Sequence, residues 1–304
     1  MSIFLNTNGK LLKIKELSFD LEKDIQKITE ENLQSIFNLE FVRSQFELNS
    51  LKIDTLAYDN ETNSFVILEY KRDKNFSVID QGYAYLALML NNKADFILEC
   101  NEICKKNLKK ENIDWTQSRV IFISPAFTNY QQKAIHFKDL PIELWEIKKY
   151  DNKIVLYNQL KSPDSSESIN TISQKNEVVK KVSREVKVYT EEYHTGDVSD
   201  DLNEVYQKLK ENILNLGNDI EIVPRKDYIA FKRKSNFVDV EFQKSKIKIF
   251  INLTKGHLDD TKKVAKDVSN IGHWGNGDYE IHLSNLDQIT YLMTLIKQSY
   301  DKNI

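Results

Sequence analysis

Two short stretches, Leu51-Lys-Ile-Asp-Thr-Leu-Ala-Tyr58 and Phe65-Val-Ile-Leu-Glu-Tyr-Lys71, decide the fold of this 304-residue chain. Both have the apolar and β-branched content of strands, and the polar residues 59–63 between them have the composition of a turn. The sequence therefore predicts a β-hairpin. The second stretch opens with four apolar residues, which is typical of a central strand buried on both faces.

Three polar residues of this hairpin form a candidate site. Side chains alternate faces along a strand, so Glu69 and Lys71 are expected to project the same way, and the hairpin can bring Asp54 opposite them. Two carboxylates and a backbone carbonyl, that of Tyr70, suit Mg²⁺. A nearby ammonium can polarise a water molecule for attack on a phosphodiester. The residues thus outline a nuclease site.

The short motif is weak evidence by itself, because 29% of the residues are charged. Similar acid-x-Lys triplets occur elsewhere: Glu146-Ile-Lys148, Glu185-Val-Lys187, Asp151-Asn-Lys153 and Asp260-Thr-Lys262. Only Glu69-Tyr-Lys71 ends a long apolar run, where a charge is costly unless it is paired or bound to a metal. The alternative interpretation is a structural ion pair that closes a sheet edge.

Two predicted helices flank the hairpin. Ser77 and Asp80 have the pattern of a helix start, and the helix is expected to run to Leu90 with Gln81 and Tyr85 on one face. Upstream, residues 19–37 read as one amphipathic helix, with Glu22 beside a buried stripe of Leu21, Ile25, Ile28 and Ile36. An isolated acid on such a helix is most often only solvated.

The ordered set formed by Glu22, Asp54, Glu69-Tyr-Lys71 and Gln81-x-x-x-Tyr85 resembles the PD-(D/E)xK nuclease superfamily, and the NucS-like and RecB-like nuclease domains in particular. The resemblance covers about residues 15–125. It implies a restriction-endonuclease-like α/β fold, a mixed central sheet flanked by helices. Glu30 and Glu31 are alternatives to Glu22 as the acid of the first helix.

The resemblance also implies roles for these residues. Asp54 and Glu69 would be metal ligands for Mg²⁺ or Mn²⁺, and Lys71 would activate water or stabilise charge. Glu22 would be an auxiliary acid, and Gln81 and Tyr85 would position the other groups. The function implied is a metal-dependent DNA endonuclease of bacterial repair or anti-phage defence. The alternative is a non-catalytic module that binds nucleic acid or protein and keeps the nuclease fold as a scaffold.

The pattern of helices and strands predicts two domains. Residues 1–160 alternate helix and strand, as expected for an α/β domain with a mixed sheet. Residues 161–197 are polar and poor in aromatic residues, which predicts a linker, and the basic run Lys180-Lys-Val-Ser-Arg184 within it could contact phosphate or be solvated. Residues 198–304 predict a smaller α+β domain of helix, strand meander and closing helix.

The second domain offers few catalytic candidates. Lys244, Lys246 and Lys248 alternate with apolar residues, and a cross-strand charge ladder with Asp239 and Glu241 explains them without DNA. The loop from Gly272 to Asp278 contains His273 and three glycines but lacks a second His or Cys at ligand spacing. Residues 197–304 resemble uncharacterised bacterial domains that follow nuclease-like domains, which implies substrate or partner binding.

Composition limits the remaining functions. The chain has 43 Lys and Arg against 46 Asp and Glu, which argues against strong non-specific binding to nucleic acid. No apolar run is long enough to cross a membrane, and the start of the sequence lacks a leader pattern, so we expect a cytoplasmic location. Cys100 and Cys104 have no partner pair for a zinc site. Expected partners are DNA and, through residues 198–304, a protein; a homodimer is left open.

Overall fold

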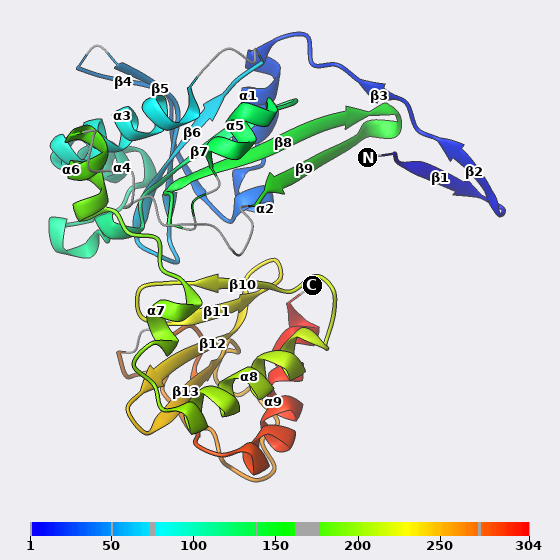
Figure 1. The fold of residues 1–304 in the computed structure, drawn as a ribbon, viewed down its shortest axis with the longest axis vertical. Helices are drawn as coiled ribbons and strands as arrows, with labels where there is room; N and C mark the ends of the chain where they lie inside the picture. Colours follow the sequence, from blue (N-terminus) through cyan, green and yellow to red (C-terminus); the bar gives the residue numbers. More distant parts are fainter. Residues whose placement is uncertain are drawn as a thin grey trace. The chain divides into compact units, whose positions relative to one another are not determined.

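The computed structural model describes residues 2–49, 51–72, 77–135, 137, 139–161, 177–272 and 275–303. The chain divides into two compact units, Met1–Val188 and Tyr189–Ile304. Each has its own sheet and helices (Figure 1). The predicted architecture of a mixed sheet flanked by helices, followed by a smaller α+β unit, is confirmed.

The N-terminal unit is built on a seven-stranded sheet with the order β3-β8-β7-β6-β5-β4, in which β9 also pairs with β8. β4, β5 and β6 are antiparallel, whereas β6, β7 and β8 run parallel, so the sheet is mixed. The strands are β3 (Glu16–Leu17), β4 (Glu40–Leu48), β5 (Leu51–Asp59), β6 (Ser64–Tyr70), β7 (Arg119–Ser124), β8 (Ile142–Tyr150) and β9 (Ile154–Leu160).

β6 lies near the centre of this sheet, and all seven of its residues are buried. Its apolar side chains alternate between two cores: Phe65 and Ile67 enter one, and Val66 and Leu68 enter the other. This alternation follows from the period of two along a strand. It explains why the sequence of β6 reads as a continuous apolar run.

Helices cover both faces of the sheet. The core on one face contains residues of α3 (Val78–Asn91), α4 (Lys93–Cys104) and α6 (Glu177–Glu185), and the core on the other contains residues of α1 (Glu22–Glu30) and α2 (Leu33–Phe37). The short α5 (Asn129–Ala134) contacts α3. The prediction of one helix over residues 19–37 is wrong. Asn32 adopts a non-helical backbone and its side chain caps the Ile28 carbonyl, which separates α1 from α2.

The predicted linker at 161–197 is also wrong for the part that the structure describes; residues 162–176 lie outside it. Residues 177–185 form α6, and Val179, Val182 and Val186 pack into the core beside α3. Residues from Tyr189 onward belong to the second unit. The linker prediction failed because three apolar side chains at helical spacing are enough to bury an otherwise polar segment.

A separate hairpin precedes the sheet. β1 (Phe4–Thr7) and β2 (Lys10–Lys13) pair only with each other among the described strands, and all eight of their residues are exposed. Gly9 allows the tight turn with a φ of 81°. In Figure 1 the hairpin projects from the rest of the N-terminal unit.

The C-terminal unit contains a six-stranded antiparallel sheet with the order β10-β11-β12-β13-β15-β14. Its core combines one face of this sheet with α8 and α9. The elements are α7 (Glu191–Thr195), α8 (Asp200–Leu214), β10 (Glu221–Pro224), β11 (Ile229–Lys232), β12 (Asn236–Gln243), β13 (Lys246–Ile251), β14 (Lys266–Asp267), β15 (Tyr279–Leu283) and α9 (Ile289–Lys302).

The predicted charge ladder of this sheet exists only in part. Lys248 lies opposite Glu241, with 3.5 Å between its Nζ and the Glu241 Oε1. Asp239 does not take part, because it is fully buried and accepts hydrogen bonds from Asn236 and from the backbone and side chain of Asn276. Burial of Asp239 beside the segment that carries Asn276 thus overrides the charge alternation read from the sequence.

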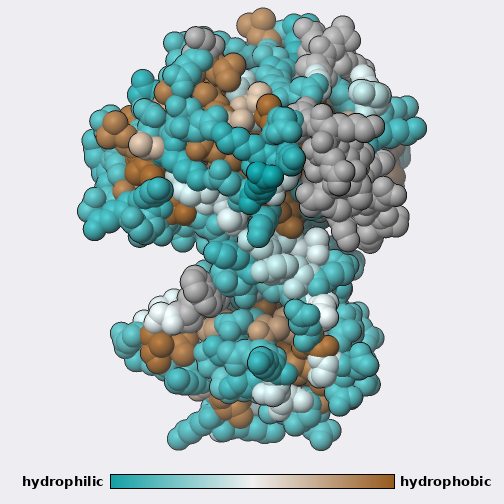
Figure 2. All heavy atoms as spheres, turned by 60° about the vertical axis from the view of Figure 1, so that its left-hand side comes forward, coloured by the Kyte–Doolittle hydropathy of each residue, from teal (hydrophilic) through white to brown (hydrophobic). Residues whose placement is uncertain are grey.

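On the face shown in Figure 2, hydrophobic side chains form small, separate patches among hydrophilic ones. Within the described ranges, none of the helices combines the length and the apolar character needed to span a lipid bilayer.

Candidate active site

Glu69 and Lys71 meet where β6 ends. The Lys71 Nζ lies 2.6 Å from the Glu69 Oε1, so the two side chains project to the same side, as strand alternation predicts. The Glu69 side chain is 5% exposed and that of Lys71 is 21% exposed. The Lys71 backbone N–H continues the sheet by donating to the Ile123 carbonyl of β7. Both groups are therefore fixed by the central strands.

α3 supplies two further groups. It begins after Ser77, whose hydroxyl accepts the Asp80 N–H, and this cap places Gln81 in the first turns of the helix. The Gln81 Nε2 donates to the Glu69 Oε1 at 2.9 Å and to the Tyr85 hydroxyl at 3.1 Å. Tyr85 in turn donates to the Lys52 carbonyl at 3.1 Å. Tyr85 thus orients Gln81 toward Glu69.

Asp54 comes from an irregular point of β5. The β4–β5 register pairs Ser44 with Thr55 and Phe46 with Ile53, so Asp54 and its opposite residue are left out of the ladder. The Asp54 Oδ2 accepts the Tyr70 N–H at 3.1 Å, which brings this carboxylate to the end of β6. Asp54 therefore lies beside the backbone that joins the other two groups.

The electrostatics of the site are dominated by Glu69. Burial raises the pKa of its carboxyl, the Asp54 carboxylate adds to the rise, and the Lys71 ammonium opposes it. Lys71 and Gln81 both bind Oε1, whereas the buried Oε2 accepts no hydrogen bond from the described residues. The Tyr85 hydroxyl, which also donates to the Lys52 carbonyl, lies close enough to Glu69 to oppose the rise of its pKa.

A divalent cation fits these donors. Carboxylate oxygens suit Mg²⁺ and Mn²⁺, and a buried carboxylate oxygen that lacks a donor is the kind of atom a cation would satisfy. Within the part of the chain that the structure describes, there is no group of three or more His, Cys, Asp or Glu side chains arranged for a metal. Asp54 and Glu69 alone would match Mg²⁺, which usually takes one or two carboxylates and keeps several waters.

The predicted acids of the first helix lie near the site in different ways. Glu22 is exposed, and its Oε2 accepts the Arg72 N–H at 2.9 Å, directly after Lys71. Glu30 is two turns away on the same face of α1 and accepts the Thr55 hydroxyl at 2.5 Å. Glu31 is exposed at the end of α1. Glu22 thus contacts the backbone that follows Lys71, whereas Glu30 contacts Gln26 and Thr55.

The Tyr70 side chain does not enter the site. It packs into the core on the α1 face, and its hydroxyl lies 3.1 Å from that of Thr55. Burial raises its pKa. The role suggested for Tyr70 concerns its backbone carbonyl and stays a prediction.

Two residues that the sequence reasoning missed contact Asp54. The Gln45 Nε2 donates to the Asp54 Oδ1 at 3.2 Å, and the Gln26 Nε2 donates to the Asp54 carbonyl at 2.9 Å. Gln26 could have been found from its spacing, because it lies four residues from both Glu22 and Glu30 and so shares their helix face. Gln45 could have been found from the pairing of β4 with β5, in which it lies opposite Asp54.

The other candidates are explained by packing. Lys181 of the basic run binds the Asn91 side chain at 2.7 Å within the α6–α3 contact. In the Gly272–Asp278 loop, His273 and Trp274 lie outside the described residues, and the Asp278 carboxylate accepts the Lys255 N–H. Among the described residues, neither segment places a further catalytic side chain next to one of the predicted site residues.

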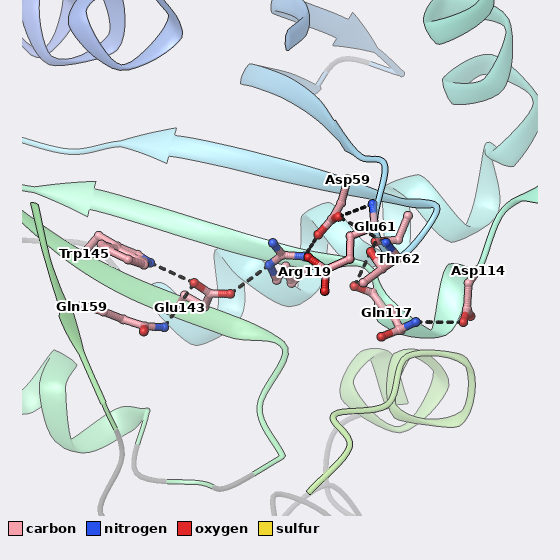
Figure 3. Close-up of polar contacts among 10 residues, drawn as sticks. Asp59, Glu61, Thr62, Asp114, Gln117, Arg119, Glu143, Trp145 and Gln159 are labelled. Carbon is pink, nitrogen blue, oxygen red and sulfur yellow. Dashed lines mark hydrogen bonds and ion pairs between the residues drawn. The ribbon is translucent and has the colours of Figure 1, made fainter. Parts of the chain in front are cut away.

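At the opposite end of the sheet, charged and polar residues form a network of ion pairs and hydrogen bonds (Figure 3). Arg119 bridges Asp59 at 3.0 Å and Glu143 at 2.9 Å, and the second Glu143 oxygen accepts from Trp145 and Gln159. Both oxygens of Glu143 are therefore used. This network is structural, in contrast to Glu69, where one buried oxygen is left over.

Comparison with known proteins places the chain in a family. Residues 191–303 match a family described as Domain of unknown function (DUF5655). The whole chain belongs to the same family as a protein of Haemophilus influenzae described as uncharacterized, with 50% identity over 299 residues that cover 98% of this chain and 99% of the relative.

Two solved structures also share a weak likeness. One is a repair endonuclease from Pyrococcus abyssi and the other is a complex of EndoMS with double-stranded DNA, with TM-scores of 0.23 and 0.24 and 17% identity to each. Each match covers 40% of this chain, and 45% and 43% of the respective solved chains.

Proposed function

We propose that this protein is a nuclease that hydrolyses phosphodiester bonds of DNA with Mg²⁺ or Mn²⁺, and that Asp54 and Glu69 hold the metal. The observation that carries the proposal is the buried Glu69 Oε2, which has no donor among the described residues although a second carboxylate lies close by. The ordered motif set through Tyr85 supports the same conclusion. A role in bacterial repair or anti-phage defence is the biological setting we propose.

The residues divide the work as follows. A bound divalent cation would supply Lewis acidity toward a water molecule and a phosphate oxygen. Asp54 and Glu69 would hold it, and Gln81 keeps Glu69 in one orientation through its 2.9 Å hydrogen bond. Lys71 presents an ammonium that can stabilise the negative charge developing on the phosphate. Glu22 lies at the edge of the site, where it can accept a proton.

The rival explanation is that Glu69 and Lys71 form only a structural ion pair, in which case the protein would be a non-catalytic binding module. It accounts for the 2.6 Å contact between Glu69 and Lys71. It gives no reason for a second carboxylate beside a buried one, an arrangement that raises the pKa of Glu69 and is unfavourable without a cation. The nuclease proposal explains both carboxylates and the orientation of Gln81.

The deciding experiment compares cleavage by the parent protein and Lys71→Ala. The substrates are labelled single- and double-stranded DNA and RNA, each with Mg²⁺, Mn²⁺ or EDTA. We expect metal-dependent DNA cleavage by the parent and a loss of about 100- to 1,000-fold for Lys71→Ala, because one charge-stabilising group is removed. Mn²⁺ affinity should stay close to that of the parent, since Lys71 is not a ligand.

Glu143→Gln is the matched control, because Glu143 is a partly buried, ion-paired carboxylate at the other end of the sheet. It should cleave like the parent. Binding of DNA without cleavage under every metal condition would favour the binding module. Cleavage unaffected by Lys71→Ala would place the activity elsewhere.

A further inference from the structure

Gln45 has a backbone conformation that is unusual for a residue inside a strand. Its φ is 53°, in the left-handed region, although it lies in the middle of β4. Gly usually occupies this region, because it has no Cβ to approach the backbone, and Asn and Asp do so because their short polar side chains can hydrogen-bond locally. Strain of this kind persists only where neighbouring contacts enforce it, and it is frequent at functional sites.

The strain coincides with the break in the ladder at Asp54. Ser44 and Phe46 pair with Thr55 and Ile53, whereas Gln45 and Asp54 do not pair. The break also changes the face of the sheet to which β5 residues point. Ile53 and Thr55 are two apart and would share a face in a regular strand. Instead, Ile53 packs on the α3 face, whereas Thr55 donates to Glu30 of α1 on the other face. The irregular backbone therefore determines where Asp54 points.

The Gln45 side chain then binds two groups. Its Nε2 donates to the Asp54 Oδ1 at 3.2 Å and to the Gln26 Oε1 at 3.1 Å. Because the Asp54 Oδ2 accepts the Tyr70 N–H, each carboxylate oxygen has its own donor. Two donors from different strands prevent the carboxylate from rotating.

Gln26 completes the arrangement from α1. Its Nε2 lies 2.9 Å from the Asp54 carbonyl and 2.8 Å from the Glu30 Oε1, so one amide contacts both the backbone of the ligand residue and a helix acid. Its oxygen faces the Gln45 amide. The direction of each amide is therefore set by its neighbours.

We propose that Gln45 and Gln26 are positioning residues for metal binding, and that the strained backbone of Gln45 is kept because it aims an amide at the Asp54 carboxylate. The inference rests on the proposed function. Hydrogen-bond partners of metal ligands typically contribute 10- to 100-fold to metal affinity or activity. The competing explanation is that Gln45 only stabilises the β4–β5 pairing.

The two explanations differ for Gln45→Gly. Glycine accepts a φ of 53° without strain, so this variant keeps the backbone but loses the amide. Gln45→Met keeps the length of the side chain and the strain, and also loses the amide. Lys105→Gly is the control, since Lys105 is an exposed residue with a φ of 55° at the end of α4 and makes no contact with the site residues named above.

The experiment measures Mn²⁺ affinity by electron paramagnetic resonance and the metal-free unfolding midpoint by urea titration. We expect Gln45→Gly and Gln45→Met to bind Mn²⁺ about 10- to 100-fold more weakly than the parent. Gln45→Gly should unfold at a higher urea concentration than Gln45→Met, and Lys105→Gly should bind Mn²⁺ like the parent.

Parent-like Mn²⁺ affinity in Gln45→Gly would overturn the inference. It would show that the Gln45 amide does not contribute to metal binding and that Gln45 only stabilises the β4–β5 pairing. A parent protein that binds no Mn²⁺ gives a different result. It would overturn the proposed function, and this inference with it.

Discussion

Asp54→Asn tests the site without changing its shape. In the parent, the two carboxylate oxygens accept from two different donors, the Tyr70 N–H at 3.1 Å and the Gln45 Nε2 at 3.2 Å. Asparagine has only one acceptor oxygen, so its amide nitrogen must face one of these donors. Gln45 cannot simply turn its amide, because the same nitrogen donates to Gln26. One hydrogen bond is lost, which costs about 1 kcal/mol in the free energy of unfolding.

The larger effect should appear when metal is added. A ligand at 100 times its Kd stabilises the folded state by about 2.7 kcal/mol. For a folded unit of this size, about 1 kcal/mol shifts Tm by roughly 2–4 °C, so Mn²⁺ should raise the Tm of the N-terminal unit by roughly 5–11 °C. Asp54→Asn removes a charged ligand and should reduce this shift to near zero.

The assay is differential scanning calorimetry in Mn²⁺ and in EDTA. Glu143→Gln serves again as control and should keep the full metal shift, although it weakens the Arg119 network. A full Mn²⁺ shift in Asp54→Asn would refute the assignment of Asp54 as a ligand. Loss of the shift in both variants would show that the loss in Asp54→Asn is not specific to the proposed ligand.

Two further predictions concern the supports of the fold. A Cβ on Gly82 would lie 2.5 Å from the Ile142 Cδ1 and 2.9 Å from its Cγ1, so Gly82→Ala should lower the free energy of unfolding by about 1–3 kcal/mol, and combination with Ile142→Val should restore part of it in urea denaturation. In the second unit, burial lowers the pKa of His194, whose Nε2 donates to the Arg225 carbonyl at 2.7 Å. The unfolded chain then binds a proton more readily than the folded one. The stability that His194 contributes should therefore be complete above about pH 6.5 and be lost as pH falls through the lower folded pKa. Urea titrations at pH 7.5 and 5.5 should show this loss in the parent and not in His194→Gln.

The sequence predicts those parts of the fold that local periodicity controls. The apolar run ending at Glu69 and the Ser77 cap correctly predict β6 and α3, because burial and capping act on neighbouring residues. The break at Asn32 was missed, since an amphipathic stripe can continue across two helices. α6 was missed because its buried valines are set in a polar segment whose partner, α3, is distant in sequence.

The site was predictable to a similar degree. Strand alternation and helix spacing indicate that Glu69, Lys71, Gln81 and Tyr85 can meet, and their contacts in the structure agree with this geometry. The left-handed backbone of Gln45 could not be predicted, because glutamine has no intrinsic preference for it. It depends on contacts with Asp54 and α1 that exist only after the sheet has formed.

The compactness of the candidate site along the chain has a consequence for folding. Asp54, Glu69 and Lys71 belong to one hairpin, and α3 follows it directly. Loop-closure entropy is small for contacts between nearby segments, and elements rich in local contacts form quickly. The groups proposed to bind metal therefore come together in a local folding event, whereas the Gln26 contact also requires the docking of α1, which α2 and β4 separate from the hairpin in the chain.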